Sequence, residues 1–223
     1  MPRIFYKPYK FLEKQTKFII SPQIIKFNKF DPKLKVGILA SGEGSNFQRL
    51  IDLSKNNKLD IELNILITNK PNAGCLKKAI DNNIPKEILV ESHFKNKDSF
   101  EKKIIDTLNQ YDVELVVMAG WMKIVSKRFI NAFENKIINI HPSLLPAFKG
   151  ISPVDDALKN GSLITGCSVH FVVPEVDSGS LIIQGALPVE KIDNKISLTK
   201  KIHEIEHKIL PIAISEAGKI IRT

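Results

Sequence analysis

The chain has 223 residues, of which 43% are hydrophobic, and it carries a formal net charge of +9 at pH 7. This length and composition allow the core of one domain to be buried, and no apolar run approaches the roughly 20 residues that cross a bilayer. We expect no secretory signal, because the first residues mix basic and aromatic side chains, and therefore predict a cytoplasmic protein without a membrane partner.

The positive charge is concentrated at the start of the chain. Residues 1–32 hold seven basic residues against two acidic ones, a net +5, and the other 191 residues carry the remaining +4. We interpret residues 1–32 as a basic N-terminal extension, partly ordered, and residues 33–223 as the folded domain. The extension contains only one serine, Ser21, which disfavours a targeting peptide. Because RNP1, zinc-finger and KH patterns are missing, we expect no nucleic-acid partner, although a basic anion- or nucleic-acid-binding module stays the non-enzyme alternative.

The two cysteines do not suggest a metal site or a disulfide. Cys75 and Cys167 lie far apart in the sequence and form no CxxC pattern. They are typical of reduced thiols in a cytosolic protein. The chain has no HExxH motif and no cluster of Cys and His at ligand spacing, so no metal is expected.

Strand-like and helix-like segments alternate through the first two thirds of the domain. Apolar, β-branched runs predict strands, and apolar residues at helical spacing predict helices. The predicted strands are 34–40, 61–68, 86–90, 113–120 and 136–141, and the predicted helices are 45–57, 73–83 and 97–111. This alternation predicts an α/β fold with a mostly parallel, Rossmann-like sheet flanked by helices.

The pattern changes after residue 150. Residues 164–189 contain two strand-like runs around the turn "PEVDSGS", which predicts an antiparallel strand pair near the C-terminal end. Residues 195–218 then place apolar side chains on one stripe of a long helix. Pro211 lies inside this helix and should kink it or break its hydrogen bonding locally.

A glycine-containing turn, "SGEGSN", joins the first predicted strand to the first predicted helix. Glycine lets a backbone approach a ligand closely, and the free N–H groups of a helix N-terminus favour an anion. The turn is neither a complete GxGxxG motif nor a phosphate loop of the GK[ST] type. A plain turn with Ser45 as the N-cap is the alternative interpretation, and the turn alone leaves both open.

Asn139 and His141 lie two residues apart at the end of a predicted parallel strand. Their side chains therefore project to the same side, into the crevice where such sheets bind ligands. An amide can donate to an oxyanion, and an imidazole can act as acid, base or charge stabiliser. The alternative is a core histidine beside a turn asparagine. Taken alone, Asp177 is typical of a turn residue, and His170, inside an apolar strand, is typical of a structural one.

On the last predicted helix, Glu206 and His207 stand side by side. Taken alone, this pair is most simply part of a solvated helix face.

Four segments carry a resemblance to a known family: "GILASGEGSNFQRLID", "AGWMKIV", "NIHPSLLPAFKG" and "SVHFVVPEVDSG". From about Lys35 to Ile214 the chain resembles the phosphoribosylglycinamide formyltransferase family of folate-dependent enzymes. The resemblance implies transfer of a formyl group from 10-formyltetrahydrofolate, as donor co-substrate, to the amine of glycinamide ribonucleotide in de novo purine biosynthesis. It also implies small-molecule partners only and a protein that acts as a monomer or homodimer, with residues 33–223 as the formyltransferase domain.

The same resemblance implies roles for individual residues. Asn139 would bind the formyl oxygen, His141 would donate a proton or stabilise the oxyanion, and Asp177 would lie against His141 and raise its pKa. The residues implied in binding the ribonucleotide hold its phosphate or lie near its amino end: Gly44, Ser45, Asn46 and Glu206. Those implied in binding the folate line its pocket: Lys78, Met122, Lys123, Ile124, Val125 and Asn139.

The chain departs from the family pattern in two places. The family usually reads Met-Arg-Ile-Leu where this chain has Met122-Lys123-Ile124-Val125, and it often has arginine where Lys78 stands. Arginine binds a carboxylate through two parallel hydrogen bonds, whereas lysine offers a point charge. Because both positive charges are kept, we expect folate binding with an altered affinity.

Two related enzymes are the alternatives within the superfamily. Formyltetrahydrofolate deformylase, a hydrolase, shares the "LPAFKG" run, but it carries an N-terminal regulatory domain that 32 residues cannot supply. Methionyl-tRNA formyltransferase shares "NIHPSLLP" but adds a C-terminal domain that grips tRNA, whereas this chain ends after its last predicted helix. The "SGEGSN" turn favours the ribonucleotide enzyme over both.

Overall fold

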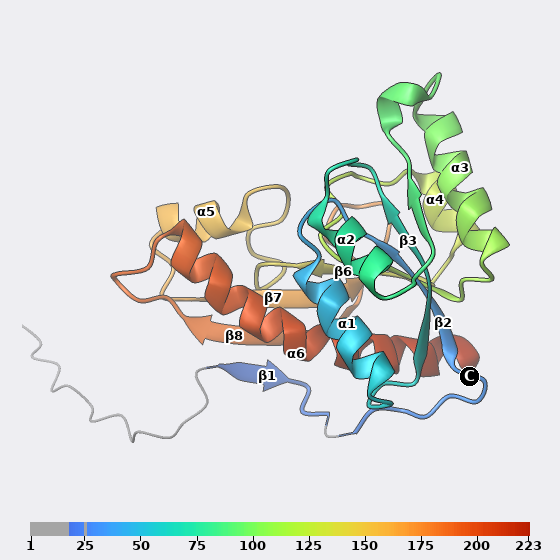
Figure 1. Ribbon diagram of the computed structural model, residues 1–223. Helices are drawn as coiled ribbons and strands as arrows, with labels where there is room; N and C mark the ends of the chain where they lie inside the picture. The colour runs from blue at the N-terminus through green and yellow to red at the C-terminus, as the bar shows by residue number, and fades with distance from the viewer. Residues whose placement is uncertain (1–17, 25) are drawn as a thin grey trace, which may run out of the picture.

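The computed structural model describes residues 18–24 and 26–223, whose strands form a single eight-stranded sheet (Figure 1). The order of strands across the sheet is β1-β8-β7-β6-β5-β2-β3-β4. The strands span these residues: β1 Ile19–Ser21, β2 Leu34–Leu39, β3 Ile61–Thr68, β4 Lys86–Ile88, β5 Leu115–Met118, β6 Ile137–His141, β7 Ile164–Phe171 and β8 Leu181–Pro188.

Neighbouring strands from β2 to β6 pair in parallel, and β6, β7, β8 and β1 pair antiparallel. The predicted fold class, a mostly parallel sheet with an antiparallel strand pair, is confirmed. The prediction missed β1, which pairs with β8 and makes the antiparallel group one strand larger.

Seven helical segments accompany the sheet within the described residues. They are α1 Ser45–Lys55, α2 Gly74–Asp81, the 3-10 turn η1 Glu91–His93, α3 Lys97–Gln110, α4 Lys127–Ala132, α5 Pro153–Lys159 and α6 Lys195–Arg222. The helices predicted from periodicity agree with α1, α2, α3 and α6. The short helices α4 and α5 were not predicted, because six or seven residues hold too few turns for a clear period.

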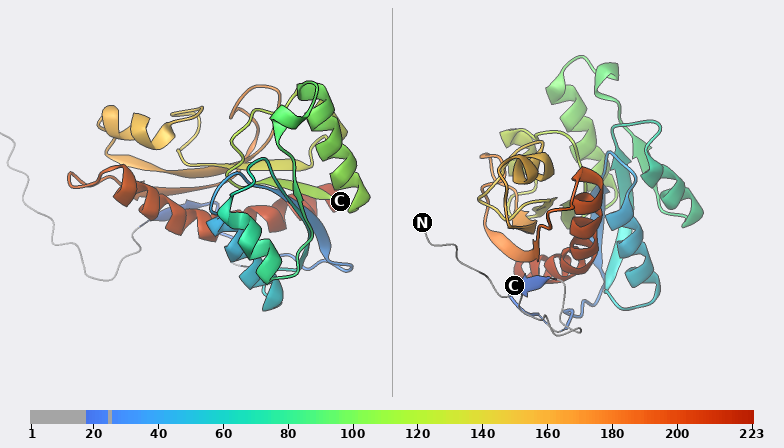
Figure 2. Two further views of the ribbon diagram at one scale, coloured as in Figure 1. Left: turned by 45° about the horizontal axis from the view of Figure 1, so that its top comes forward. Right: turned by 90° about the vertical axis from the view of Figure 1, so that its left-hand side faces the viewer.

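Two layers of helices bury the two faces of the sheet (Figure 2). Successive residues of a strand point to opposite faces, so Ile38 packs with residues of α1, α2 and α6, whereas Leu39 packs with residues of α3 and α4. Both of these side chains are fully buried. A parallel sheet that is covered on both faces explains why its strands are continuous apolar runs.

Strand order reverses at β2, which lies between β3 and β5. In open α/β sheets the crevice at such a switch point, outside the carboxyl ends of the strands, is the usual place for ligands. Here the chain leaving β2 meets the chain leaving β5, since Ser41 N donates to Gly120 O at 3.0 Å. The fold therefore brings the "SGEGSN" turn, the segment after β5 and the end of β6 to one edge.

Helix α6 stays helical through Pro211, and Figure 1 shows it changing direction part-way along its length. Proline has no N–H, so the carbonyl of His207, four residues earlier, loses its helical donor. The guanidinium of Arg49 on α1 supplies another donor, with Nε 3.3 Å from that carbonyl. The predicted local break in hydrogen bonding at Pro211 thus becomes a contact between two helices. Among the described helices none is both long enough and apolar enough to span a membrane.

The described part of the extension packs against the domain. Asn28 donates from its backbone to Ser215 Oγ at 2.6 Å and from its side chain to Ser215 O and Glu216 Oε1, at 3.1 and 2.9 Å. Four apolar side chains of the segment lie against the core: Phe18, Ile20, Phe27 and Phe30. The boundary between residues 32 and 33 stays a prediction, and the interpretation of residues 1–17 lies outside the described residues.

Candidate active site

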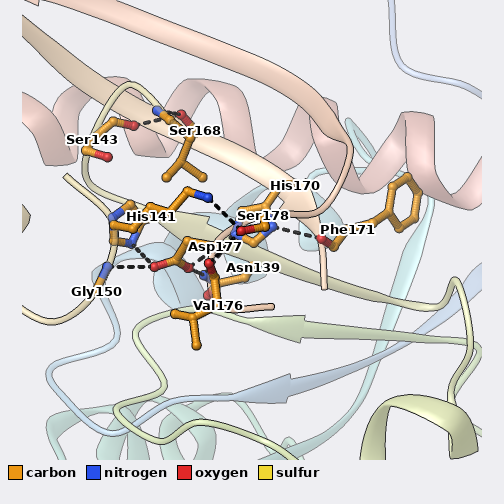
Figure 3. A network of polar contacts seen from close by, with 12 residues as sticks. Asn139, His141, Ser143, Gly150, Ser168, His170, Phe171, Val176, Asp177 and Ser178 are labelled. Atoms are coloured by element: carbon orange, nitrogen blue, oxygen red, sulfur yellow. Dashed lines mark hydrogen bonds and ion pairs between the residues drawn. The ribbon is translucent and has the colours of Figure 1, made fainter. Parts of the chain in front are cut away.

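Asn139 and His141 project from β6 to the same side of the sheet, as their spacing predicts (Figure 3). The antiparallel partner β7 places His170 opposite Asn139 and Ser168 opposite His141. His141 is only 5% exposed. The end of β6 thus presents an amide and an imidazole that are positioned by main-chain pairing on both sides.

Asp177, in the loop between β7 and β8, is the centre of this cluster (Figure 3). Its Oδ2 atom lies 3.4 Å from His141 Nδ1 and accepts a hydrogen bond from Gly150 N at 2.9 Å. Its Oδ1 atom lies 3.5 Å from both His170 Nε2 and Asn139 Nδ2. The carboxylate therefore joins β6, β7 and the loop after β6 in one polar network.

The environment of Asp177 favours its ionised form. Burial on its own raises the pKa of this carboxyl. The hydrogen bonds from His170 and Gly150, together with the charges of His141 and His170, outweigh burial and leave the pKa below its ordinary value. The residue adopts φ 49°, a left-handed conformation that aspartate tolerates better than most residues. A turn conformation and a polar role thus coexist at one residue.

The second nitrogen of His141 contacts the loop that follows β6. Its Nε2 atom lies 2.8 Å from the carbonyl oxygen of Phe148. Since Nδ1 faces the Asp177 carboxylate, both ring nitrogens of His141 face oxygen atoms. A substrate atom could contact Nε2 only by replacing the carbonyl oxygen of Phe148.

The loop after β6 is held by polar side chains of β7 and β8, the buried Ser168 and the half-buried Gln184. Ser168 Oγ accepts from Leu145 N at 3.0 Å and donates to Ser143 O at 2.7 Å. Gln184 donates to Leu145 O at 3.0 Å, and the Leu145–Pro146 peptide is cis. The position of the Phe148 carbonyl over His141 therefore follows from contacts on the strands themselves.

His170 belongs to the cluster, although the sequence favoured a purely structural residue. Its Nε2 lies 3.3 Å from Asn139 Nδ2 and 3.5 Å from Asp177 Oδ1, and its Nδ1 lies 2.8 Å from Phe171 O. It is almost fully buried, so the expectation of a residue inside an apolar strand is met. The register of β6 and β7 was the missing information, because it places His170 beside Asn139.

The "SGEGSN" turn leaves the N-terminus of α1 open. Gly44, and not Ser45, occupies the N-cap, and among the described residues no side chain caps this helix. Gly44 has φ 71°, and a Cβ atom there would lie 2.6 Å from Cys75 Cβ. The turn therefore needs glycine for both conformation and space. The interpretation of Ser45 as a capping residue is wrong, and the first-turn N–H groups of α1 stay free for an acceptor.

Asn46, at the start of α1, contacts Glu206 of α6. Asn46 Nδ2 donates to Glu206 Oε2 at 2.8 Å, and His203 Nε2 lies 3.9 Å from the same oxygen. Glu206 is 5% exposed, so its assignment to a solvated helix face is wrong. Burial raises the pKa of Glu206, against the opposing effects of His203 and Asn46. Within the described residues Asn46 Oδ1 is buried without a partner.

The segment Met122–Val125 leaves the carboxyl end of β5 and runs beside the turn after β2. Met122 N donates to Ser41 Oγ at 3.0 Å. The side chains of Met122 and Ile124 are 66% and 65% exposed, and Lys123 forms an ion pair with Glu91. The segment thus offers exposed apolar surface next to a charged pair.

A cavity of about 590 Å³ opens beside this segment, lined by Lys123 and Glu91 together with Lys70 and Lys97. Lys78 does not line this cavity. It lies on α2 near Cys75, and its amine makes no hydrogen bond or ion pair with the residues that the structure describes. Of the two lysines, Lys123 therefore lines this cavity and Lys78 does not.

The family model described as formyl transferase matches residues 34–214. A curated relative, the phosphoribosylglycinamide formyltransferase of Bacillus subtilis, is 36% identical over 82% of this chain and 93% of its own. The chain belongs to the formyl transferase family. The crystal structure of glycinamide ribonucleotide transformylase 1 from Symbiobacterium toebii superposes with a TM-score of 0.83 at 33% identity and covers 89% of this chain and 93% of that one.

Larger members of the formyl transferase family also match. The human trifunctional purine biosynthetic protein adenosine-3 is 39% identical over 82% of this chain, which spans only 18% of that protein. The match thus covers one part of the trifunctional relative. Both the Bacillus subtilis and the human match support the resemblance that the four sequence segments carry.

Proposed function

We propose that the protein transfers the formyl group of 10-formyltetrahydrofolate to the amine of glycinamide ribonucleotide, giving formylglycinamide ribonucleotide and tetrahydrofolate. The observation that carries the proposal is the cluster of Asn139, His141 and Asp177, which lies at the same edge of the sheet as an uncapped helix N-terminus. The names of the relatives from Bacillus subtilis and Symbiobacterium toebii support the same reaction.

The catalytic residues would act on the formyl carbon and its oxygen. The amine nitrogen of the ribonucleotide forms a bond to the formyl carbon, and the oxygen becomes negative in the tetrahedral intermediate. Asn139 Nδ2 and a protonated His141 would donate to that oxygen, and one such donor typically contributes about 10²–10³ in rate. Collapse breaks the bond to the folate nitrogen, and the proton that the amine loses must reach that nitrogen. His141, held by Asp177, would carry it.

The ribonucleotide would lie between α1 and α6. Its phosphate would accept hydrogen bonds from the first-turn N–H groups of α1 and from Ser45 and Asn46, since helix N-termini favour anions. The buried Glu206, which is fixed by Asn46, would accept a hydrogen bond near the amino end of the substrate. Gly44 would let the phosphate approach the backbone closely, because its Cα carries no side chain.

The folate would lie along the segment Met122–Val125. A pterin and an aminobenzoyl group need apolar surface, and Met122 and Ile124 offer it. The glutamate tail of folate carries carboxylates, and three lysines, Lys70, Lys97 and Lys123, are among the residues that line the cavity beside the segment. The residues present therefore fit the donor. Lys78 does not line this cavity, and its part in binding the folate stays a prediction.

Formyltetrahydrofolate deformylase is the less favoured alternative. A hydrolase would need the same catalytic cluster but would have no use for an uncapped helix N-terminus beside a buried carboxylate. We place the reaction in the cytoplasm, which the free and buried thiols of Cys75 and Cys167 support. Whether the protein acts as a monomer or a homodimer stays a prediction.

The deciding experiment incubates the purified protein with 10-formyltetrahydrofolate, with and without glycinamide ribonucleotide. We expect formylglycinamide ribonucleotide and tetrahydrofolate to form in equal amounts, and only when both substrates are present. Release of free formate at the same rate in the absence of the ribonucleotide would instead identify a deformylase. Tight, salt-sensitive binding of nucleic acid without any formyl transfer would support the non-enzyme alternative.

A further inference from the structure

Glu101, on α3, is a buried carboxylate with none of the roles described above. It is 2% exposed. Its Oε1 accepts a hydrogen bond from Ser126 N at 2.9 Å, and its Oε2 accepts another from the Ser126 hydroxyl. The amine of Lys97 lies 3.8 Å from Oε1. Burial of a carboxylate costs free energy unless the group is hydrogen-bonded or paired with a charge. Ser126 and Lys97 are the partners that offset this cost for Glu101.

All of these contacts lead to the segment that follows β5. Glu101 fixes Ser126, the residue immediately after the proposed folate-binding segment Met122–Val125. Lys97, paired with Glu101, donates from Nζ to the carbonyl oxygen of Ile124 at 2.8 Å. One carboxylate thus fixes the chain at two points: directly at Ser126, just after the segment, and through Lys97 at Ile124, inside the segment.

Capping of α4 does not require this carboxylate. The hydroxyl of Ser126 already caps α4 by accepting a hydrogen bond from Phe129 N at 3.3 Å. Glu101 adds a bond to the backbone of Ser126 and a charge that orients Lys97, and neither contact satisfies a free N–H group inside α4. What the carboxylate specifies is the path of the chain between β5 and α4.

We infer that Glu101 is a positioning residue for the folate donor. By fixing residues 124 and 126 it holds the exposed side chain of Ile124, and it pairs with Lys97, which lines the cavity beside the segment. This inference rests on the proposed function, since it assigns the donor to the segment Met122–Val125. It involves no contact between Glu101 and the reacting atoms.

The test is Glu101→Gln, which keeps the shape of the side chain and one acceptor oxygen but removes the charge. Loss of one charge-assisted hydrogen bond predicts a rise of about tenfold in the KM for 10-formyltetrahydrofolate and in the calorimetric Kd for tetrahydrofolate. The kcat and the KM for glycinamide ribonucleotide should stay within about twofold, because Glu101 contacts neither the reacting atoms nor the ribonucleotide site. A protein that is merely destabilised would not show an effect on one substrate alone.

Asp106→Asn is the matched control. Asp106 lies on the same helix and pairs with Lys102 at 3.0 Å, but its side chain is 54% exposed. Its replacement removes the same charge from α3 and should change neither KM. A donor KM and a tetrahydrofolate Kd that are unchanged in Glu101→Gln, or equal in the two variants, would overturn the inference.

Ser126→Ala serves as a second variant, and it decides the matter if Glu101→Gln does not fold. It removes the hydroxyl contact and should raise the tetrahydrofolate Kd several-fold, whereas an unchanged Kd would overturn the inference. Where both variants fold, the effect of the double variant on the tetrahydrofolate Kd should be less than the sum of the two single effects, because both substitutions act on one contact.

A wild-type protein that binds tetrahydrofolate but transfers no formyl group would refute the proposed reaction and leave the binding comparison decisive. A wild-type protein that does neither would refute both.

Discussion

The Nδ1 atom of His141 lies 3.4 Å from Oδ2 of Asp177, so the imidazole at the end of β6 meets the carboxylate of the loop between β7 and β8. The backbone N–H of Gly150 donates to the same carboxylate oxygen and adds the loop after β6. Three separate stretches of chain therefore determine the orientation of one imidazole. Each of the predictions below changes one residue of this candidate site or of the neighbouring contact between α1 and α6.

His141→Ala should lower kcat for formyl transfer by about 10²–10⁴, the usual contribution of a positioned acid or base. The melting temperature should change little in comparison, because the β6 and β7 backbone pairing does not depend on the ring. Steady-state rates and thermal unfolding check both parts. His93→Ala, at an exposed histidine of η1, is the control and should retain full activity. Near-normal turnover in His141→Ala would remove this residue from its proposed role.

Asp177→Asn should make stability less dependent on acid pH. The pKa of Asp177 lies below its ordinary value, because the contacts with His170, Gly150 and His141 outweigh burial. Such a group stabilises the fold above the unfolded-state pKa, and this contribution is lost as pH falls through the folded-state pKa. Asparagine tolerates the φ of 49°, so the backbone should be kept.

The difference in unfolding free energy between wild type and Asp177→Asn should therefore be largest near neutral pH and should shrink toward about pH 3, below the ordinary aspartate pKa. Denaturant titrations at several pH values measure it. A difference that stays constant across this range would show that the charge of Asp177 is not what stabilises the cluster. The activity of the variant should also fall, since His141 loses its anionic partner.

Gly44→Ala should destabilise the protein by roughly 1–3 kcal/mol, because a left-handed conformation is strained for a residue with a side chain. The added Cβ would also lie 2.6 Å from Cys75 Cβ. Displacement of the turn should raise the KM for the ribonucleotide more than the KM for the folate. Gly42→Ala is the matched control, since a Cβ there meets nothing within 4 Å. Equal melting temperatures for the two variants would contradict this account of the turn.

Glu206→Gln should increase stability at neutral and alkaline pH while it impairs function. Burial raises the pKa of Glu206, so its favourable contribution is present at low pH and is lost as pH rises through the folded-state pKa. Glutamine can still accept from Asn46 without carrying a buried charge. The gain in unfolding free energy should vanish near pH 4, at about the ordinary glutamate pKa.

For the same variant we expect the KM for glycinamide ribonucleotide to rise by at least about tenfold, the effect of one lost hydrogen bond to a charged group. Glu204→Gln, at an exposed position of the same helix, should alter neither stability nor KM. A Glu206→Gln protein that is less stable than wild type at pH 8 would show that the carboxylate has a stronger partner than Asn46.

The parallel part of the sheet was predictable because its strands are buried on both faces. Runs such as that of β2 must then be continuously apolar, and the helices between them must show one apolar stripe. β1 was not predictable, because three residues carry no period and its pairing with β8 is decided by contacts far along the chain. The helices α4 and α5 were missed for the first of these reasons.

The candidate site was predictable where its geometry is local. Two-residue spacing on a strand places Asn139 and His141 on one side in any register. His170, Asp177 and Glu206 depend on neighbours from other elements, and their types and local sequence are equally typical of turn, core or surface residues. Family resemblance supplied roles for Asp177 and Glu206. Glu101 had no motif at all, and only the packing of α3 against the chain after β5 reveals it.

The hydrogen bonds from Asn28 to Ser215 join positions 187 residues apart, and Arg222 donates to the carbonyl oxygens of Pro32 and Lys33 nearby. The strands that carry the candidate site therefore lie within a stretch of chain whose two ends are joined by hydrogen bonds. Tension applied through the two termini, for example by a tethered partner or an unfolding protease, would load the pairing of β1 with β8 and these hydrogen bonds before it reached β6. A force on either end of the chain would thus act on these contacts before it acted on Asn139 and His141.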